Sequence, residues 1–217
     1  MSLFGRRNEY DRGRLVREAL EYQRRGKHKK ALARFRRVIV AEPNNVEVHA
    51  QIAPSLCECG LEFSAWGSYT TVASALLKND KKQAALDLYR DATERMPHHY
   101  EAWTARATLE HRMERTADAK RTLEAALPHF RRHAARYQLI SLLRALLKLN
   151  PSDRRTTLEL SRVLSKTGQR EEALALLAKL ATSAHGPLLR LVRRTQWNVT
   201  PSLAHSWLWL RSCLATS

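Results

Sequence analysis

Hydrophobic residues recur along the chain at helical spacing, and the same pattern occurs three times at equal intervals. One such series leads from Leu15 to Tyr69 to Leu123, and apolar character survives at each step. Three further series behave alike: Ala19, Ala73 and Leu127; Tyr22, Leu76 and Phe130; Phe35, Tyr89 and Leu143. No segment shows the period-2 alternation of a half-buried strand. The pattern therefore predicts about eleven or twelve helices and no sheet.

Prolines and capping residues indicate where these helices end and begin. Pro43, Pro97 and Pro151 are spaced at the same interval as the apolar series, each between a helical pattern and a polar pair. Asn45 and Asp153 are good N-caps, because their side-chain oxygens can accept hydrogen bonds from the unpaired N–H groups of a first turn. We expect helices to end shortly before each proline and to restart soon after it.

Pro54 stands inside the helical pattern of residues 46–59. Proline has no backbone N–H, and its ring clashes with the carbonyl four residues earlier. We expect it to bend or break that helix near Ala50.

Small or apolar residues mark the expected contact in each helix pair, with gaps that alternate between 34 and 20: Ala31, Ala65, Ala85, Ala119, Leu139 and Ala173. A 34-residue helix-turn-helix period, with alanine in the second helix and proline after it, resembles the tetratricopeptide repeat family. The resemblance is close over residues 66–99 and extends to 12–45 and 154–187. The matching positions in 66–99 are Tyr69, Val72, Ala73, Leu76, Ala85, Tyr89, Ala92 and Pro97.

The resemblance implies an all-α fold, a right-handed α-solenoid of tetratricopeptide-like repeats. The shorter gaps add a three-helix super-repeat with a period of 54, the sum of the two gaps. We divide the chain into a short N-terminal segment (1–11), a repeat domain (12–200) and a C-terminal amphipathic capping helix (201–217).

Four apolar residues of the last segment fall at i, i+4, i+7 and i+11: Leu203, Trp207, Leu210 and Leu214. This stripe predicts that the helix caps the last repeat by packing Leu203, Trp207, Leu210 and Leu214 against it. Trp209 lies about 120° away around the helix. We therefore expect Trp209 to stay accessible as an anchor for a partner or a lipid interface.

The chain is strongly basic, with 38 Lys and Arg against 21 Asp and Glu and a formal net charge of +17. Residues 1–45 carry 13 basic and 5 acidic side chains, whereas residues 46–99 carry 5 and 7. The candidate binding residues form one cluster at Arg24, Arg25, Lys27, Lys29 and Lys30 and another at Arg131, Arg132 and Arg136. Such clusters are compatible with a solvated surface, or with binding to an acidic protein segment, a nucleic-acid backbone or an anionic lipid surface.

Motifs for catalysis and cofactor binding are missing from the sequence. There is no glycine-rich phosphate loop, nucleophile elbow or paired-carboxylate motif, so we predict no enzyme activity and no cofactor. Cys57, Cys59 and Cys213 are too few for a disulfide framework, and their spacing does not favour a metal site. Without a signal-peptide pattern or a long apolar stretch, we expect a cytoplasmic protein. The excess of Arg over Lys is compatible with a bacterial source.

One unit also resembles the half-tetratricopeptide variant of RNA-processing proteins. Trp103 precedes Glu110 by seven residues, and Ala119, Leu123 and Ala126 follow. Position 106 is Arg, where that variant prefers an aromatic residue.

These features predict a non-catalytic, tetratricopeptide-like scaffold or adaptor that binds another protein through its helical surface and basic ends. The Lys, Arg and Asn clamp with which this family holds a C-terminal carboxylate is absent. RNA binding is the first alternative. Peripheral attachment to an anionic membrane, through the basic clusters and Trp209, is the second.

Overall fold

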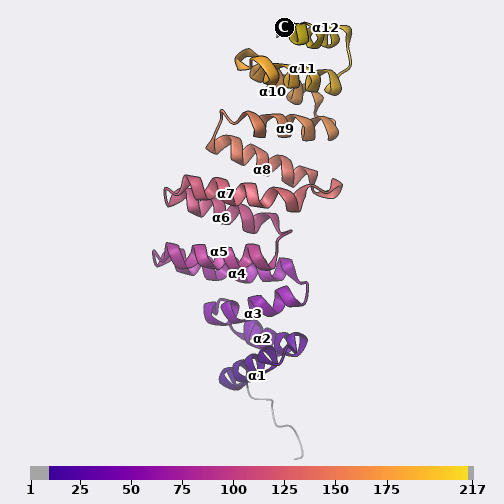
Figure 1. Cartoon of the computed structure of the whole chain (residues 1–217). Helices are drawn as coiled ribbons and strands as arrows, with labels where there is room; N and C mark the ends of the chain where they lie inside the picture. The colour runs from indigo at the N-terminus through magenta and orange to yellow at the C-terminus, as the bar shows by residue number, and fades with distance from the viewer. Residues whose placement is uncertain (1–9, 215–217) are drawn as a thin grey trace, which may run out of the picture. The chain divides into compact units, whose positions relative to one another are not determined.

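The computed structural model describes residues 10–214 (Figure 1). Twelve α-helices and two 3-10 turns make up this range, and it contains no strand. The all-α prediction is confirmed. The chain divides into two compact units, Met1–Met113 and Glu114–Ser217, which are described separately below. The proposed N-terminal segment 1–11 lies mostly outside the described residues, and our three-part division stays a prediction.

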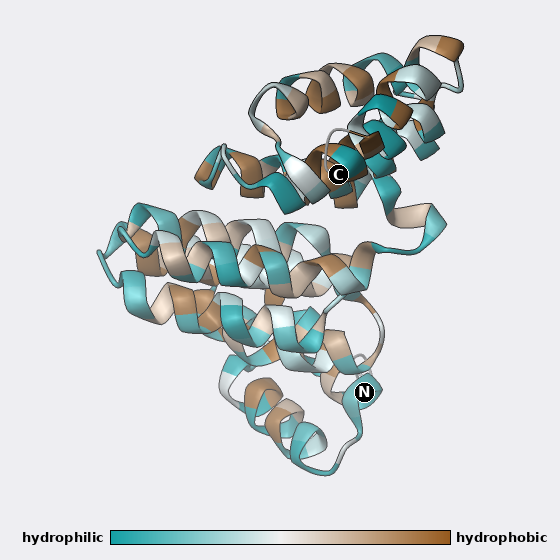
Figure 2. Cartoon of the chain, turned by 45° about the horizontal axis from the view of Figure 1, so that its top comes forward, coloured by the Kyte–Doolittle hydropathy of each residue, from teal (hydrophilic) through white to brown (hydrophobic). Residues whose placement is uncertain are grey.

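In the first unit, each helix packs against the next one along the chain, and α1 also contacts α3. Hydrophobic and hydrophilic residues are interspersed along these helices, as the patches of brown and teal in Figure 2 show. The six helices are α1 (Arg12–Arg24), α2 (His28–Ala41), α3 (Val46–Glu58), α4 (Glu62–Lys78), α5 (Lys82–Arg95) and α6 (Tyr100–Arg112).

In the second unit, α9 packs against α8, α10 and α11. The last two helices, α11 and α12, pack against each other. The elements are α7 (Thr116–Ala126), the 3-10 turns η1 (Leu127–Phe130) and η2 (His133–Ala135), α8 (Arg136–Leu149), α9 (Arg154–Lys166), α10 (Arg170–Ser183), α11 (Gly186–Val199) and α12 (Leu203–Leu214).

The helix ends follow the predicted signals. Pro43, Pro97 and Pro151 each stand two residues beyond a helix end, after α2, α5 and α8. Asn45 and Asp153 act as N-caps: Asn45 Oδ1 accepts from the Val48 N–H at 3.1 Å, and Asp153 Oδ1 accepts from two N–H groups of α9. The bounds of α2, α5 and α8 recur at equal intervals along the sequence, and those of α3, α6 and α9 recur at the same interval. That whole three-helix units superpose at this interval stays a prediction.

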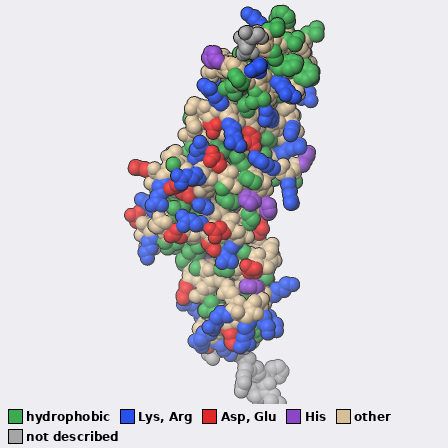
Figure 3. All heavy atoms as spheres, viewed as in Figure 1, with side chains coloured by type: hydrophobic (Ala, Val, Ile, Leu, Met, Phe, Trp, Pro, Cys, Tyr) green, Lys and Arg blue, Asp and Glu red, His purple; other side chains and the backbone are tan. Residues whose placement is uncertain are grey.

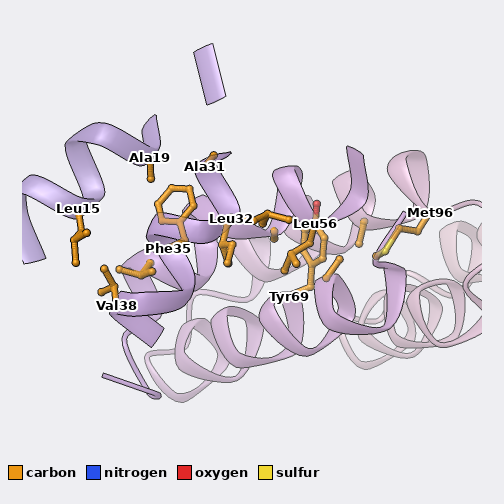
Figure 4. Close-up of a cluster of buried hydrophobic side chains, with 14 of the residues drawn as sticks. Leu15, Ala19, Ala31, Leu32, Phe35, Val38, Leu56, Tyr69 and Met96 are labelled. Carbon is orange, nitrogen blue, oxygen red and sulfur yellow. The ribbon is translucent and has the colours of Figure 1, made fainter. Parts of the chain in front are cut away.

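The repeated apolar positions form the core. Leu15, Tyr69 and Leu123 are at most 3% exposed, and the five alanines predicted at the helix contacts are fully buried. Figure 4 shows part of this core in the first unit, where Leu15, Phe35 and Val38 lie among buried side chains from neighbouring helices. Tyr22 and Leu76 are only half-buried, whereas Phe130, the third residue of that series, is 2% exposed.

A polar network joins α4 to α5 beside this core. The Tyr69 hydroxyl donates to Asp91 Oδ2, and Arg95 Nε donates to Asp91 Oδ1 at 2.8 Å. Burial and the hydrogen bond to Asp91 raise the pKa of Tyr69. Burial also raises the pKa of Cys57 to about 11. The Cys57 thiol therefore stays protonated at neutral pH.

Of the bend or break expected at Pro54, the break does not occur, because α3 continues from Val46 to Glu58. Proline removes one backbone hydrogen bond, but packing around it holds the helix together. Ile52, Ala53 and Leu56 are each at most 4% exposed in the core of the first unit.

The expected orientation of the last helix is also wrong. Leu203, Trp207, Leu210 and Leu214, which we expected to pack inward, are 91%, 64%, 50% and 75% exposed. Trp209, which we expected to be accessible, is half-buried, and Ser212 opposite the stripe is buried. Leu208 and Trp209 give α12 a second apolar side, so periodicity alone could not decide which side faces the protein.

The fully buried Ala85 gives a test of the register. Ala85→Leu should lower the free energy of unfolding by about 1–3 kcal/mol, because added methyl groups overpack a helix contact. The neighbouring Ala84 is exposed, so Ala84→Leu is a matched control and should change stability little. Chemical denaturation of both variants measures the difference. Equal stabilities of the two variants would contradict the register.

Candidate functional site

Helix α9 carries a charged stripe opposite its buried side. Arg155, Glu159, Arg162 and Lys166 fall at i, i+4, i+7 and i+11, so they share one face. Leu164, on the buried side of α9, is fully buried. The core therefore fixes the direction in which the charged stripe points.

Two adjoining cavities lie along this stripe, within the second unit. Their volumes are about 790 Å³ and about 450 Å³, and both are lined by Arg162, Lys166 and Leu191. We call the two cavities together the basic groove. Its side chains come from α8, α9 and α11 and from the segment after η1, and its Lys and Arg residues are Arg131, Arg136, Arg154, Arg155, Arg162, Lys166 and Arg194.

The charge of the basic groove is largely unbalanced. Glu159 is the one carboxylate among its lining residues, against seven cations, which leaves an excess of six positive charges. Glu159 Oε1 lies 3.6 Å from Arg131 Nη2. Among residues 10–214, no ion pair engages any of the other six groove cations. Figure 3 shows several Lys and Arg side chains over α8 and α9.

The basic groove has an apolar floor beneath these charges. Leu139 and Leu158 are buried there, and Val163 and Leu188 are half-buried. Leu191 extends the apolar surface into the second cavity and is 39% exposed. Such a lining can receive a ligand that combines negative charge with apolar groups.

The predicted cluster Arg131, Arg132 and Arg136 lies only partly in the basic groove. Arg131 and Arg136 line it, and Arg136 Nη1 donates to the Lys166 carbonyl oxygen at 3.5 Å. Arg132 is exposed but does not line either cavity. Trp209 is on α12, away from the lining residues.

The other predicted cluster lies in the first unit, at the turn between α1 and α2. Lys27, Lys29 and Lys30 border an open cavity of about 500 Å³, which also contains Glu58. Arg24 is exposed there. Arg25 pairs with Glu21, and Lys30 Nζ lies 5.9 Å from the centroid of the Tyr22 ring. This turn cluster is partly neutralised, and its cavity has no leucine in its lining, in contrast to the basic groove.

Five groove cations are not among the residues predicted from the sequence: Arg154, Arg155, Arg162, Lys166 and Arg194. A signal for three of them was present in the sequence. Arg155, Arg162 and Lys166 follow the helical spacing of one face, just as the apolar residues do. Clusters of adjacent charges form a continuous run in the sequence, whereas charges on one helix face are separated by three or four positions.

The residues that resemble the half-tetratricopeptide variant are structural. Trp103 is 7% exposed, and its Nε1 donates to the Pro97 carbonyl oxygen at 2.9 Å. Glu110 is 2% exposed, and Arg106 Nε donates to Glu110 Oε1 at 3.1 Å. The Arg that departs from this variant thus partners a buried carboxylate.

Two further properties concern the described part of the chain. Within residues 10–214, no group of three or more His, Cys, Asp or Glu side chains is arranged to hold a metal ion. No helix in that range has the length and apolar character needed to cross a membrane.

Helices that pack in sequence through buried alanines define a helical-repeat protein. Residues 76–141 match the family model described as "Tetratricopeptide repeat". The helical repeats of this chain are therefore tetratricopeptide-like. No curated protein matches the chain.

Solved structures of several repeat proteins are similar to the chain. A putative protein binding protein from Bacteroides ovatus is 16% identical, with 95% of this chain and 98% of that chain covered and a TM-score of 0.39. A tetratricopeptide repeat protein from Parabacteroides merdae is 15% identical, with 93% and 98% covered and a TM-score of 0.29. YrrB, described as a TPR protein with an unusual peptide-binding site, is 17% identical, with 64% and 89% covered and a TM-score of 0.27.

Asp153 offers a test of the element that presents the charged stripe. Burial opposes its ionisation, but hydrogen bonds from Thr156 and from the Arg155 N–H outweigh this effect and lower the pKa of Asp153. Ionised Asp153 thus stabilises the fold above the ordinary Asp pKa, and this contribution is lost as the pH falls through the lowered value. Asp153→Ala should lower the free energy of unfolding by about 1 kcal/mol at neutral pH, because α9 loses its cap.

Asp153→Asn is the matched control, because asparagine also caps helices but does not titrate. Urea denaturation at several pH values should show the stability of the wild-type chain falling toward that of Asp153→Asn below about pH 4. A stability difference that does not change with pH would show that the charge of Asp153 is unimportant.

Proposed function

We propose that this chain is a non-catalytic scaffold that holds an acidic segment of another protein in the basic groove. The match to the tetratricopeptide repeat supports a protein-interaction scaffold in general. The single observation that carries the finer proposal is the excess of six positive charges above an apolar floor.

Arginine suits the recognition of carboxylates. Its guanidinium group can donate two parallel hydrogen bonds to one carboxylate, and such charge-assisted bonds are stronger than neutral ones. Arg155 and Arg162 lack carboxylate partners within residues 10–214. An incoming acidic side chain therefore would not have to displace an existing ion pair.

Helix geometry suggests the spacing of the acidic residues in such a segment. Arg155 and Arg162 are seven residues apart, which corresponds to about 10 Å along α9. An extended peptide rises about 3.3 Å per residue. A segment that lies along α9 would therefore meet both guanidinium groups with Asp or Glu at about every third position, and apolar residues between them would reach the leucine floor.

The composition of the basic groove favours a protein ligand over single-stranded RNA, and it favours binding over catalysis. Its lining residues include no aromatic side chain on which a base could stack. They also include no His, the residue that most often serves as a general base.

Fluorescence polarisation with a labelled acidic peptide tests this proposal. The peptide carries Glu at every third position with Leu between, and a Gln version controls for charge. Reversing Arg155, Arg162 and Lys166 to Glu should weaken binding by about tenfold or more, because bonds to charged groups contribute about 1.5–3 kcal/mol each.

A control with the same net charge reverses Arg24, Arg25 and Arg132 to Glu, all exposed and outside the basic groove. The affinity of this control for the peptide should stay within about twofold of the wild-type value, because salt screens the attraction of charges that lie outside the groove. Equal losses in the two triple variants would mean general charge attraction and no groove. RNA binding at physiological salt that is tighter than peptide binding, and that depends on the groove residues, would replace the protein partner with nucleic acid.

A further inference from the structure

The last helix presents an apolar face that the fold leaves uncovered. Leu203, Trp207, Leu210 and Leu214 lie along one side of α12 and are all at least 50% exposed. We call these four residues the apolar stripe. Single exposed hydrophobic residues are ordinary on protein surfaces, but a contiguous group on one helix face indicates an interaction site.

Helix α12 is capped at its start and packs against α11. Ser202 Oγ accepts from the His205 N–H at 3.2 Å and so caps the first turn. On the side opposite the stripe, Ser212 is 7% exposed, and its hydroxyl donates to the Trp209 carbonyl oxygen. The apolar stripe therefore faces outward because α12 packs against α11 through its other side.

The charged side chains in the last part of the sequence are all positive. Residues 173–217 contain no Asp or Glu, whereas they contain Lys179, Arg190, Arg193, Arg194 and Arg211. Arg211 is exposed on α12 itself, and on α11 Trp197 is 41% exposed. Figure 3 shows hydrophobic side chains gathered at the end of the chain that holds α12, with Lys and Arg side chains nearby.

We propose that α12 lays the apolar stripe into the headgroup region of an anionic lipid bilayer. A helix that offers Leu and Trp on one face, flanked by cations, suits that interface, where tryptophan is enriched. Anionic lipids attract Arg and Lys, and residues 173–217 contribute no Asp or Glu side chain that such lipids would repel. A net charge of +17 disfavours pairing with a second copy of the chain. This inference does not rest on the basic groove.

Vesicle flotation of the full chain tests the proposal. The chain should bind vesicles of phosphatidylcholine with about one third phosphatidylglycerol, and should bind pure phosphatidylcholine about tenfold more weakly. The double variant Trp207→Ser and Leu210→Ser should lower the affinity for anionic vesicles by about tenfold or more, because both side chains lose their burial in lipid. Its melting temperature should match that of the wild-type chain, since both residues are exposed.

The double variant Val40→Ser and Phe63→Ser is the matched control, because these residues of the first unit are 82% and 88% exposed. It should bind vesicles as the wild-type chain does. Unchanged binding of the Trp207 and Leu210 variant, or equal binding to neutral vesicles, would overturn the proposal. If the chain does not bind vesicles, it could instead form a dimer or bind an acidic helical peptide. If either interaction requires the apolar stripe, the stripe is a protein contact and the proposal is overturned.

Discussion

The close approach of neighbouring helices at buried alanines is the constraint on which the rest of the structure depends. Ala31, Ala85 and Ala173 have no contact with solvent. Protein interiors are packed as densely as organic crystals, so a larger side chain at such a point must push its helix away. The directions of the polar faces follow from these contacts. The charged stripe of α9 points into the basic groove because Leu164, on another side of the same helix, is held in the core.

Much of the fold could be predicted from the sequence, because helical periodicity and proline positions are local signals. The buried series through Leu15 and the cap at Asp153 show this. Two failures have physical causes. At Pro54, tertiary packing outweighed one lost hydrogen bond, and on α12 the two apolar sides left the orientation undecided. Both outcomes depend on packing between helices, which local patterns do not report.

The candidate site was less predictable than the fold. Arg131 and Arg136 line the basic groove, but their neighbour Arg132 does not. Adjacent charges in a sequence point to different sides of a helix or turn, whereas a groove gathers charges from several elements. Arg194, on α11, joins the groove only because α11 packs against α9.

The division of α9 into a core side and a charged side has a consequence for the evolution and the engineering of this protein. Arg155, Arg162 and Lys166 could be recoded to accept a different ligand while Leu164 continued to hold the helix in place. The same separation makes α9 a natural position at which to install a new specificity by directed evolution.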